Sequence, residues 1–420
     1  MRPGQISVLV LLLVGYGSFY LCRANVEAAL PLLLREGYDK THLGLLSSLA
    51  TGSYAIGKVV LGAAGDKLGG RRLLLVALLG SVLCSFAFGR AEAFVGLVVF
   101  AAANRFFQSG GWGAVVHVVS RWFEPGRYGL VMGVLSTSYE LGNVVALSVS
   151  AVVSRWGWRA LFIVNPLLFA VIGGTVTLCL RGEPPIAPDS IAPRPSCREG
   201  ASARPDAREE TGAALPRLFA RGAFWVTLAM SMLLTFMRVG FLTWTPTYLY
   251  EVSGRAEISG SIVKSAMFPA AGIVAALVVG PVSDRFGAGR RAPIMAASLA
   301  VVVCLTLVLA HGGVHDALPA SFLIAGIGLF LLGPYSLLAG AVALDLAGKR
   351  GTATATGIID GVGYLGATAA GYVLGRTSDR AGWSAAFDVL AAAAILSTVL
   401  ACTWSVVVFR RRGGALPAHG

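Results

Sequence analysis

Long apolar runs recur along the whole chain, and the short segments between them carry most of the charged residues. Each run is long enough to cross, as a helix, a hydrocarbon layer roughly 30 Å thick. The first run follows Arg2 and could be mistaken for a secretory signal, but it has no small-residue cleavage site, so we predict an uncleaved helix. The pattern predicts twelve membrane-spanning helices, near residues 6–34, 43–65, 73–89, 93–120, 129–153, 159–180, 222–250, 258–283, 292–311, 317–346, 351–377 and 384–409.

The composition excludes a soluble protein. Hydrophobic residues make up 56% of the 420 residues and charged residues 13%, whereas a soluble chain carries about 25% charged residues. The six cysteines are scattered and form no CxxC pair, so neither a disulfide framework nor a zinc site is predicted. We therefore expect an all-α polytopic membrane protein with no metal and no cofactor.

The net charge of +13 would suggest a nucleic-acid partner in a soluble protein. With twelve spans, however, 21 Lys and Arg residues fall on one side of the membrane, 8 fall on the other, and 5 lie inside spans. The side richer in Lys and Arg is the cytoplasmic one. We therefore predict that both termini are cytoplasmic, in a bacterial inner membrane, and that no nucleic acid binds.

Residues 181–221 differ from the rest of the chain, because seven prolines alternate there with Arg, Glu, Asp and Ser. Such a segment cannot bury apolar surface and is typical of a mobile linker. Six predicted spans lie on each side of it. We therefore predict an N-terminal six-helix bundle over 1–180, a cytoplasmic linker over 181–221 and a C-terminal six-helix bundle over 222–420.

The two predicted bundles share sequence features at a nearly fixed offset. A Gly–Asp–basic loop around Asp66 recurs around Asp284. At a closely similar offset, Gly133 recurs as Gly357, and a Gly–Trp pair at 157–158 recurs at 382–383. Parallel repeats of six helices are typical of two-bundle secondary transporters.

The first span carries Tyr16, Tyr20, Arg23 and Glu27, which share an arc of roughly 60° on a helix. A charged side chain in the middle of a membrane costs on the order of 3 kcal/mol, so each is a candidate for function. We expect these groups to face the bundle interior or a wet cavity. The alternative is an internal pair between Arg23 and Glu27, which are one turn apart and could satisfy each other.

Arg238 lies in the seventh span, and its separation from Arg23 is close to the repeat offset. We therefore expect the two arginines to face each other across the interface between the bundles. Two unpaired guanidinium groups repel each other, so such a site is explained if an anion neutralises both. The planar donors of arginine suit phosphate or carboxylate.

Motifs along the whole chain resemble those of the major facilitator superfamily, and within it the organophosphate:phosphate antiporter family. The Gly–Asp–basic loops resemble the signature loop of the superfamily. The narrower resemblance is carried by Gly15-Tyr16, Tyr20-Leu21, Arg23, Asn25 and Pro31, by Gly111-Trp112, by Trp122-Phe123, by the run from Leu135 to Ser138, and by Arg238, Gly240, Trp244 and Pro246.

The resemblance implies a transporter of a small anion, most simply a phosphorylated metabolite exchanged for inorganic phosphate by alternating access. It implies that Arg23 and Arg238 bind the phosphoryl group, that Lys58 lies on the same pathway, and that the phenols of Tyr16, Tyr20 and Tyr364 line the site. It also implies gating by charge pairs at cytoplasmic helix ends, here Asp66, Arg71, Arg72, Asp284, Arg290 and Arg291.

Several positions depart from the family pattern. The family commonly has a lysine at Ala24 and, in its glycerol-3-phosphate branch, a histidine at Ser138. This chain also has acidic residues within its spans that depart from the family pattern: Glu27, Glu140 and Asp360 in the first, fifth and eleventh spans. They could hold the bases apart until an anion displaces them, or one of them could take up a proton during transport. Glu140 is the main candidate for proton coupling, because its own span carries no base.

Three other functions are alternatives to an antiporter of a phosphorylated metabolite. A proton-coupled symporter of a sugar acid or another carboxylate would need a pH gradient and no phosphate on the opposite side. A transporter-like membrane sensor of a phosphorylated sugar would need a signalling partner. An enzyme is not expected, because no Ser/His/Asp set, metal-ligand cluster or phosphate-cradling loop stands out, and we assign no catalytic residue. We expect a monomer in the lipid bilayer, with inorganic phosphate or a proton as the coupled ion.

Overall fold

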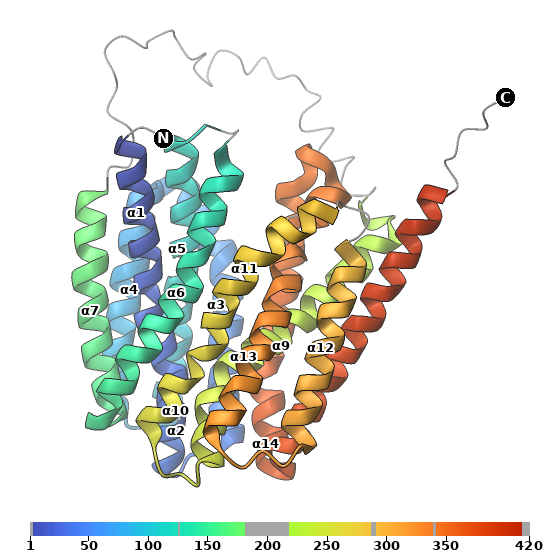
Figure 1. The fold of residues 1–420 in the computed structure, drawn as a ribbon. Coiled ribbons are helices and arrows are strands. Elements are labelled where there is room, and N and C mark those ends of the chain that lie inside the picture. Colours follow the sequence, from blue (N-terminus) through green and yellow to red (C-terminus); the bar gives the residue numbers. More distant parts are fainter. Residues whose placement is uncertain (1–2, 125–126, 181–217, 287–290, 339–341, 414–420) are drawn as a thin grey trace, which may run out of the picture.

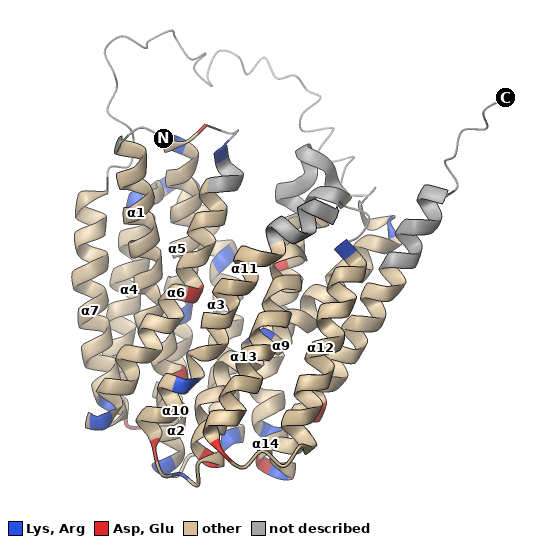
Figure 2. Cartoon of the chain, in the orientation of Figure 1, with Lys and Arg blue, Asp and Glu red and all other residues tan. Residues whose placement is uncertain are grey.

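The computed structural model describes residues 3–124, 127–180, 218–286, 291–338 and 342–413, and every regular element in these ranges is a helix (Figure 1). Most of the predicted linker 181–221 lies outside these ranges, so the domain boundaries stay a prediction. Figure 2 shows that Lys, Arg, Asp and Glu gather near helix ends, with few of them at mid-height. The site described below contains charged residues from within the spans.

The first predicted span is a broken helix. α1 (Pro3–Ser18) passes into a 3-10 turn, η1 (Phe19–Cys22), and α2 (Ala24–Arg35) completes the span. Arg23 lies at the junction, where a 3-10 segment inside a helix often marks a functional position. Pro31 within α2 has no N–H, so it cannot donate the usual helical hydrogen bond to the carbonyl of Glu27.

The other helices of the first half follow the predicted spans closely. They are α3 (Lys40–Leu68), α4 (Gly70–Arg90), α5 (Phe94–Trp122), α6 (Tyr128–Val153), η3 (Ser154–Trp156) and α7 (Trp158–Cys179). The second half consists of α9 (Gly222–Val252), α10 (Ile258–Ser265), α11 (Met267–Phe286), α12 (Arg291–His311), α13 (Ala317–Leu337) and α14 (Ala343–Gly413). The eighth predicted span is divided between α10 and α11.

The long α14 contains two membrane passes, which Figure 1 draws in orange and in red. Gly382 has a φ of +81° between them, and Gly157 has a φ of +91° before α7, at the equivalent place in the first half. A positive φ interrupts a helix and suits glycine, which has no Cβ. The same residue therefore makes the same turn before the last pass of each half.

Nine helical stretches within the described ranges are long and apolar enough to cross a membrane. The last, Ala355–Trp404, has 50 residues and holds both passes of α14. α5 and α6, with 29 and 26 residues, are not among the nine but have the length of a span. Together these helices make the twelve predicted passes of an all-α membrane protein, six in each half.

α3 and α14 run antiparallel along one side of the interface between the halves. We refer to this line of contact as the α3/α14 seam. Its contacts, in order along α3, are Thr41 with Asp379, Ser48 with the backbone of Tyr372, Tyr54 with Tyr364, and Lys58 with Asp360. The seam starts at the end of the helices away from the termini (Figure 1) and reaches Lys58 and Asp360.

Candidate functional site

A cavity lies between the two halves and is lined by side chains from both. The first half contributes Arg23, Glu27 and Arg105 to its walls, and the second half contributes Arg238. Tyrosines, threonines and Asn143 supply further polar groups. The structure therefore brings the two predicted arginines to one cavity, together with a third that we had not assigned to the binding site.

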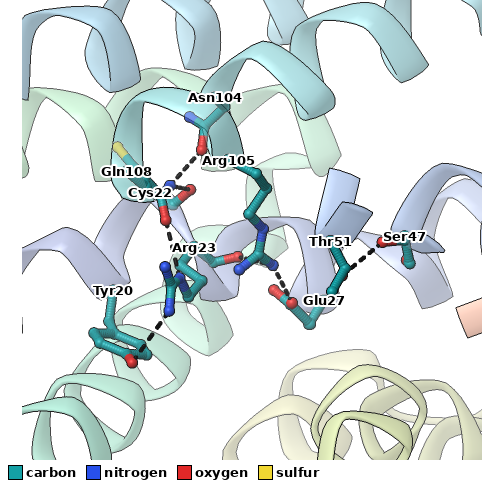
Figure 3. Close-up of polar contacts among 9 residues, drawn as sticks. All are labelled: Tyr20, Cys22, Arg23, Glu27, Ser47, Thr51, Asn104, Arg105 and Gln108. Atoms are coloured by element: carbon teal, nitrogen blue, oxygen red, sulfur yellow. Dashed lines mark hydrogen bonds and ion pairs between the residues drawn. The ribbon is translucent and has the colours of Figure 1, made fainter. Parts of the chain in front are cut away.

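Arg23 projects into the cavity from the junction of η1 and α2. Its Nε donates to Oε1 of Gln108 at 3.0 Å and its Nη1 donates to the hydroxyl of Tyr20 at 3.3 Å (Figure 3). The guanidinium carbon also lies 4.5 Å from the centre of the Tyr54 ring, a cation–π distance. Within the described ranges, no carboxylate forms an ion pair with Arg23. Its positive charge is therefore held by neutral groups only.

Gln108 of α5 is oriented by a buried hydrogen-bond network that extends to η1 and α4. Its Nε2 donates to the carbonyl of Cys22 at 2.8 Å and to Oδ1 of Asn104. Asn104 in turn donates to the hydroxyl of Ser85 at 2.7 Å. Because both amide protons of Gln108 are used, its carbonyl oxygen is left to face Arg23. This network fixes the direction of the one amide that holds the guanidinium.

Arg105 of α5 pairs with Glu27 of α2 (Figure 3). Its Nη2 also donates to the backbone carbonyl of Arg23 at 3.4 Å. The internal pair between Arg23 and Glu27, which spacing on one helix allows, is not formed. Packing of α5 against the broken first span gives Glu27 a different partner and brings Arg105 next to the backbone of Arg23.

Arg238 of α9 pairs with Glu140 of α6, with Nη2 and Oε1 3.1 Å apart. The side chains are 12% and 5% exposed, and the guanidinium also lies 5.0 Å from the centre of the Tyr335 ring. The expectation that both central arginines are unpaired is therefore wrong for Arg238. Its own helix gave no sign of this partner, which comes from the other half.

Lys58 of α3 pairs with Asp360 of α14, again across the interface. Its ammonium lies 4.6 Å from the centre of the Tyr364 ring, which in turn lies 5.2 Å from the ring of Tyr54. The ring of Tyr54 therefore lies within cation–π distance of both Arg23 and Lys58, whose ammonium is 5.8 Å from its centre. Of the three predicted tyrosines, Tyr20 and Tyr364 line the cavity, whereas Tyr16 is not among its lining residues and packs against Tyr20, with ring centres 6.3 Å apart.

The predicted gating loops are only partly described. Nε of Arg71 donates to the carbonyl of Thr177 on α7 at 3.0 Å, and Arg72 is exposed. Arg291 is buried at the start of α12. Arg290 and the side chains of Asp66 and Asp284 lie outside the described parts of the chain, so the charge pairing of these loops stays a prediction.

Several site residues were not identified from the sequence. Arg105 and Gln108 were recognisable as polar residues in the middle of a span, but only packing against Arg23 assigns them to the site. Tyr54 lies one turn before Lys58, a spacing that could have identified it. Tyr335 carries no such signal, because α13 has no charged neighbour near it.

The chain is similar in sequence to two named transport proteins and to a membrane sensor. It is 27% identical over 415 residues to the glycerol-3-phosphate transporter of Bacillus subtilis, covering 96% of this chain and 92% of that protein. It is 27% identical to a probable hexose phosphate transport protein of Chlamydia pneumoniae, covering 98% and 93%. It is also 26% identical to the membrane sensor protein UhpC of Escherichia coli, covering 94% and 90%.

Solved structures share the fold at low sequence identity. A bacterial homologue of the human lysosomal transporter Spinster superposes with a TM-score of 0.73 at 13% identity, over 98% of each chain. The nucleoside transporter NupG superposes with a TM-score of 0.70 at 13% identity, over 94% of this chain and 99% of that one. Residues 12–371 match the sequence profile of the Major Facilitator Superfamily. The chain therefore belongs to the Major Facilitator Superfamily of secondary transporters and is not an enzyme.

Proposed function

We propose that this protein exchanges a small phosphorylated metabolite for inorganic phosphate by alternating access. The observation that carries the proposal is that Arg23 and Arg238 come from opposite halves and line one cavity, where Arg23 has no carboxylate partner among the described side chains. The named relatives, a glycerol-3-phosphate transporter and a hexose phosphate transport protein, support a phosphorylated substrate.

The phosphoryl group binds between the two guanidinium groups. Charge-assisted hydrogen bonds from arginine to phosphate are short and strong, and the planar donors match phosphate geometry. Asn143, Thr235 and Thr243 in the cavity wall supply hydrogen-bonding groups for the rest of the metabolite. The bases Arg23 and Arg238 and the tyrosines around them thus hold the head group, and the polar wall receives the remainder.

The same charges explain why the uptake of one anion is coupled to the release of another. Closing the empty cavity removes water from Arg23, and a buried charge without a partner is strongly unfavourable. A bound anion neutralises it and joins the two halves, so the loaded protein reorients and the empty one does not. Return therefore requires a second anion, for which inorganic phosphate is suited.

The three buried carboxylates balance charge in this scheme. Glu27 and Asp360 keep Arg105 and Lys58 neutralised while the cavity is empty, and Glu140 does the same for Arg238. A proton on Glu140 is the alternative, and it would make the protein a symporter. The geometry favours charge balance, because Glu140 faces a guanidinium 3.1 Å away.

The proposal includes the topology and the state of the protein. Both termini are cytoplasmic, in a bacterial inner membrane, because Lys and Arg are concentrated on that side. The first helix begins and the last helix ends at the same end of the molecule (Figure 1). The protein acts as a monomer, with bundles over 1–180 and 222–420 joined by the linker 181–221.

The test uses purified protein in liposomes preloaded with inorganic phosphate. We expect uptake of radiolabelled glycerol 3-phosphate or a hexose 6-phosphate that stops when internal phosphate is omitted. Arg23→Lys and Arg238→Lys should each lower uptake at least tenfold, because an ammonium cannot replace the planar donors. Arg90→Lys, at the exposed end of α4, is the matched control and should not change it.

Two outcomes would reject antiport of a phosphorylated metabolite. Accumulation of a carboxylate under an inward proton gradient, without internal phosphate, would make the protein a symporter. Specific binding of a hexose phosphate with no uptake under any gradient would favour a sensor, a function that the 26% identity to UhpC keeps open.

A further inference from the structure

Four bases lie at the centre of the interface, and their charges are not fully balanced. Ion pairs join Arg105 to Glu27, Arg238 to Glu140 and Lys58 to Asp360. Arg23 has only neutral partners among the groups that the structure describes. Among the described side chains, four bases against three carboxylates leave the site with one uncompensated positive charge.

The two central arginines are related by the internal repeat, but their surroundings are not alike. Glu140 neutralises Arg238 from the opposite half. The repeat offset that carries Gly133 to Gly357 also carries Glu140 to Tyr364, which lines the cavity with Arg23. A carboxylate at one of these positions and a phenol at the other leave the charge of Arg238 balanced and that of Arg23 unbalanced.

Glu140 lies behind Arg238 and is not one of the residues that line the cavity. Its Oε2 is buried and has no hydrogen-bond partner in the described structure. Gly272 of α11 lies beside this carboxylate, because a Cβ there would be in van der Waals contact with the Cδ of Glu140, at 3.4 Å. The other titratable groups that face Glu140 are Tyr20 of η1, Tyr139 of α6 and Tyr335 of α13. The helices packed against α6 also carry Tyr16 on α1, Glu27 on α2, Arg105 and His117 on α5, Arg159 on α7 and Lys264 on α10.

We infer that Glu140, acting through Arg238 as a positioning residue, restricts the site to head groups with a single negative charge. This inference rests on the proposed function and adds the charge state of the substrate. A monoanion held by Arg23 and Arg238 brings the charge of the site to zero. A dianion leaves an excess negative charge close to a buried carboxylate, which is unfavourable in a medium of low dielectric constant.

A pair of small probes separates charge from other effects of pH. Methyl phosphate loses its second proton near pH 6, so about 1% remains a monoanion at pH 8. Dimethyl phosphate carries one charge at every pH used. The experiment measures the Kd of both probes by calorimetry, for the full chain in lipid nanodiscs, at pH 5.5 and pH 8.

For the unmodified protein we expect the Kd of methyl phosphate to rise roughly 50- to 100-fold from pH 5.5 to pH 8, in step with loss of the monoanion. The Kd of dimethyl phosphate should stay within about threefold. In Glu140→Gln the rise for methyl phosphate should shrink to less than about threefold, since the site then carries two positive charges. Glu140→Asp keeps the charge and should keep the rise.

The inference is overturned if methyl phosphate binds the unmodified protein equally well at both pH values, or if Glu140→Gln leaves the rise unchanged. If Glu140→Gln does not fold, the comparison of the two probes on the unmodified protein decides alone. Failure of the proposed function looks different: neither probe binds, and no phosphorylated metabolite is exchanged for phosphate in liposomes.

Discussion

Lys40 at the start of α3 and Glu251 near the end of α9 form an ion pair of 3.0 Å that joins the two halves. Nε1 of Trp383 donates to the same carboxylate at 2.5 Å. The ammonium of Lys40 lies 4.9 Å from the centre of the Trp383 ring. Three helices, α3, α9 and α14, therefore meet at the end of the molecule away from the termini and hold the interface closed there.

Breaking this contact should open that end. Glu251→Gln removes the charge that attracts Lys40, so the population of molecules open at this end should increase. Spin labels on the exposed Arg35 and Arg380, in a background without native cysteines, report it by electron–electron resonance. A longer label-to-label distance is expected. An unchanged distance distribution would mean that the ion pair does not hold the end closed.

The backbones of α3 and α14 touch at two glycines. A Cβ on Gly371 would lie 2.8 Å from the carbonyl of Gly44 and 2.9 Å from the hydroxyl of Ser48. We therefore expect Gly371→Ala to force the seam apart and to lower the exchange rate at least tenfold, with normal amounts of protein in the membrane. Gly357→Ala, on the same helix with nothing within 4 Å, is the control. Equal rates for the two variants would contradict a close seam.

A substitution at Gln108 can balance the charge of Arg23 with a carboxylate of the protein itself. Gln108→Glu places a carboxylate where the amide oxygen now lies 3.0 Å from Nε. This would take up the one uncompensated charge, so anion affinity should fall by more than tenfold. Gln108→Leu removes the hydrogen bond but keeps the positive charge, and it should weaken binding less. Competition binding with inorganic phosphate measures both, and a Leu variant as weak as the Glu variant would argue against the charge explanation.

The pair of Lys58 and Asp360 should show thermodynamic coupling. Lys58→Ala and Asp360→Ala each leave one charge without its partner, while the double variant leaves none. We expect a coupling energy of about 0.5–3 kcal/mol, toward the lower end because the side chains are 27% and 33% exposed. The free energy of unfolding of the unmodified protein, the two single variants and the double variant, measured in one detergent, completes this double-mutant cycle. Additive effects would show that the ion pair contributes nothing.

Much of the fold follows from the order of residues along the chain. The twelve passes and the two halves were predicted, because span length is set by the bilayer and each span forms its own hydrogen bonds. The repeated Gly–Trp pair marked the position before the last pass of each half, although only the backbone shows that its glycine makes a turn. The sequence also identified Arg23 and Arg238 as central bases, since a charge inside a span is costly and therefore rare. The family resemblance added Lys58.

The ion pairs could not be predicted in the same way. Glu27 is one turn from Arg23, yet it pairs with Arg105, 78 residues away in the sequence. Glu140 has no base on its own helix and pairs with Arg238, 98 residues away and in the other half. Spacing along one helix states which residues share a face, but not which face of another helix lies opposite.

The sequence alone therefore determined the number of spans, the two-bundle plan and the bases placed in the membrane, all of which depend on local hydrophobicity and helical period. Only the tertiary structure decided which of those bases has no carboxylate partner among the described side chains. That depends on how helices from distant parts of the chain pack and turn against each other, and here the packing gives carboxylates to Arg105, Arg238 and Lys58 and leaves Arg23 to a buried amide and two phenol rings.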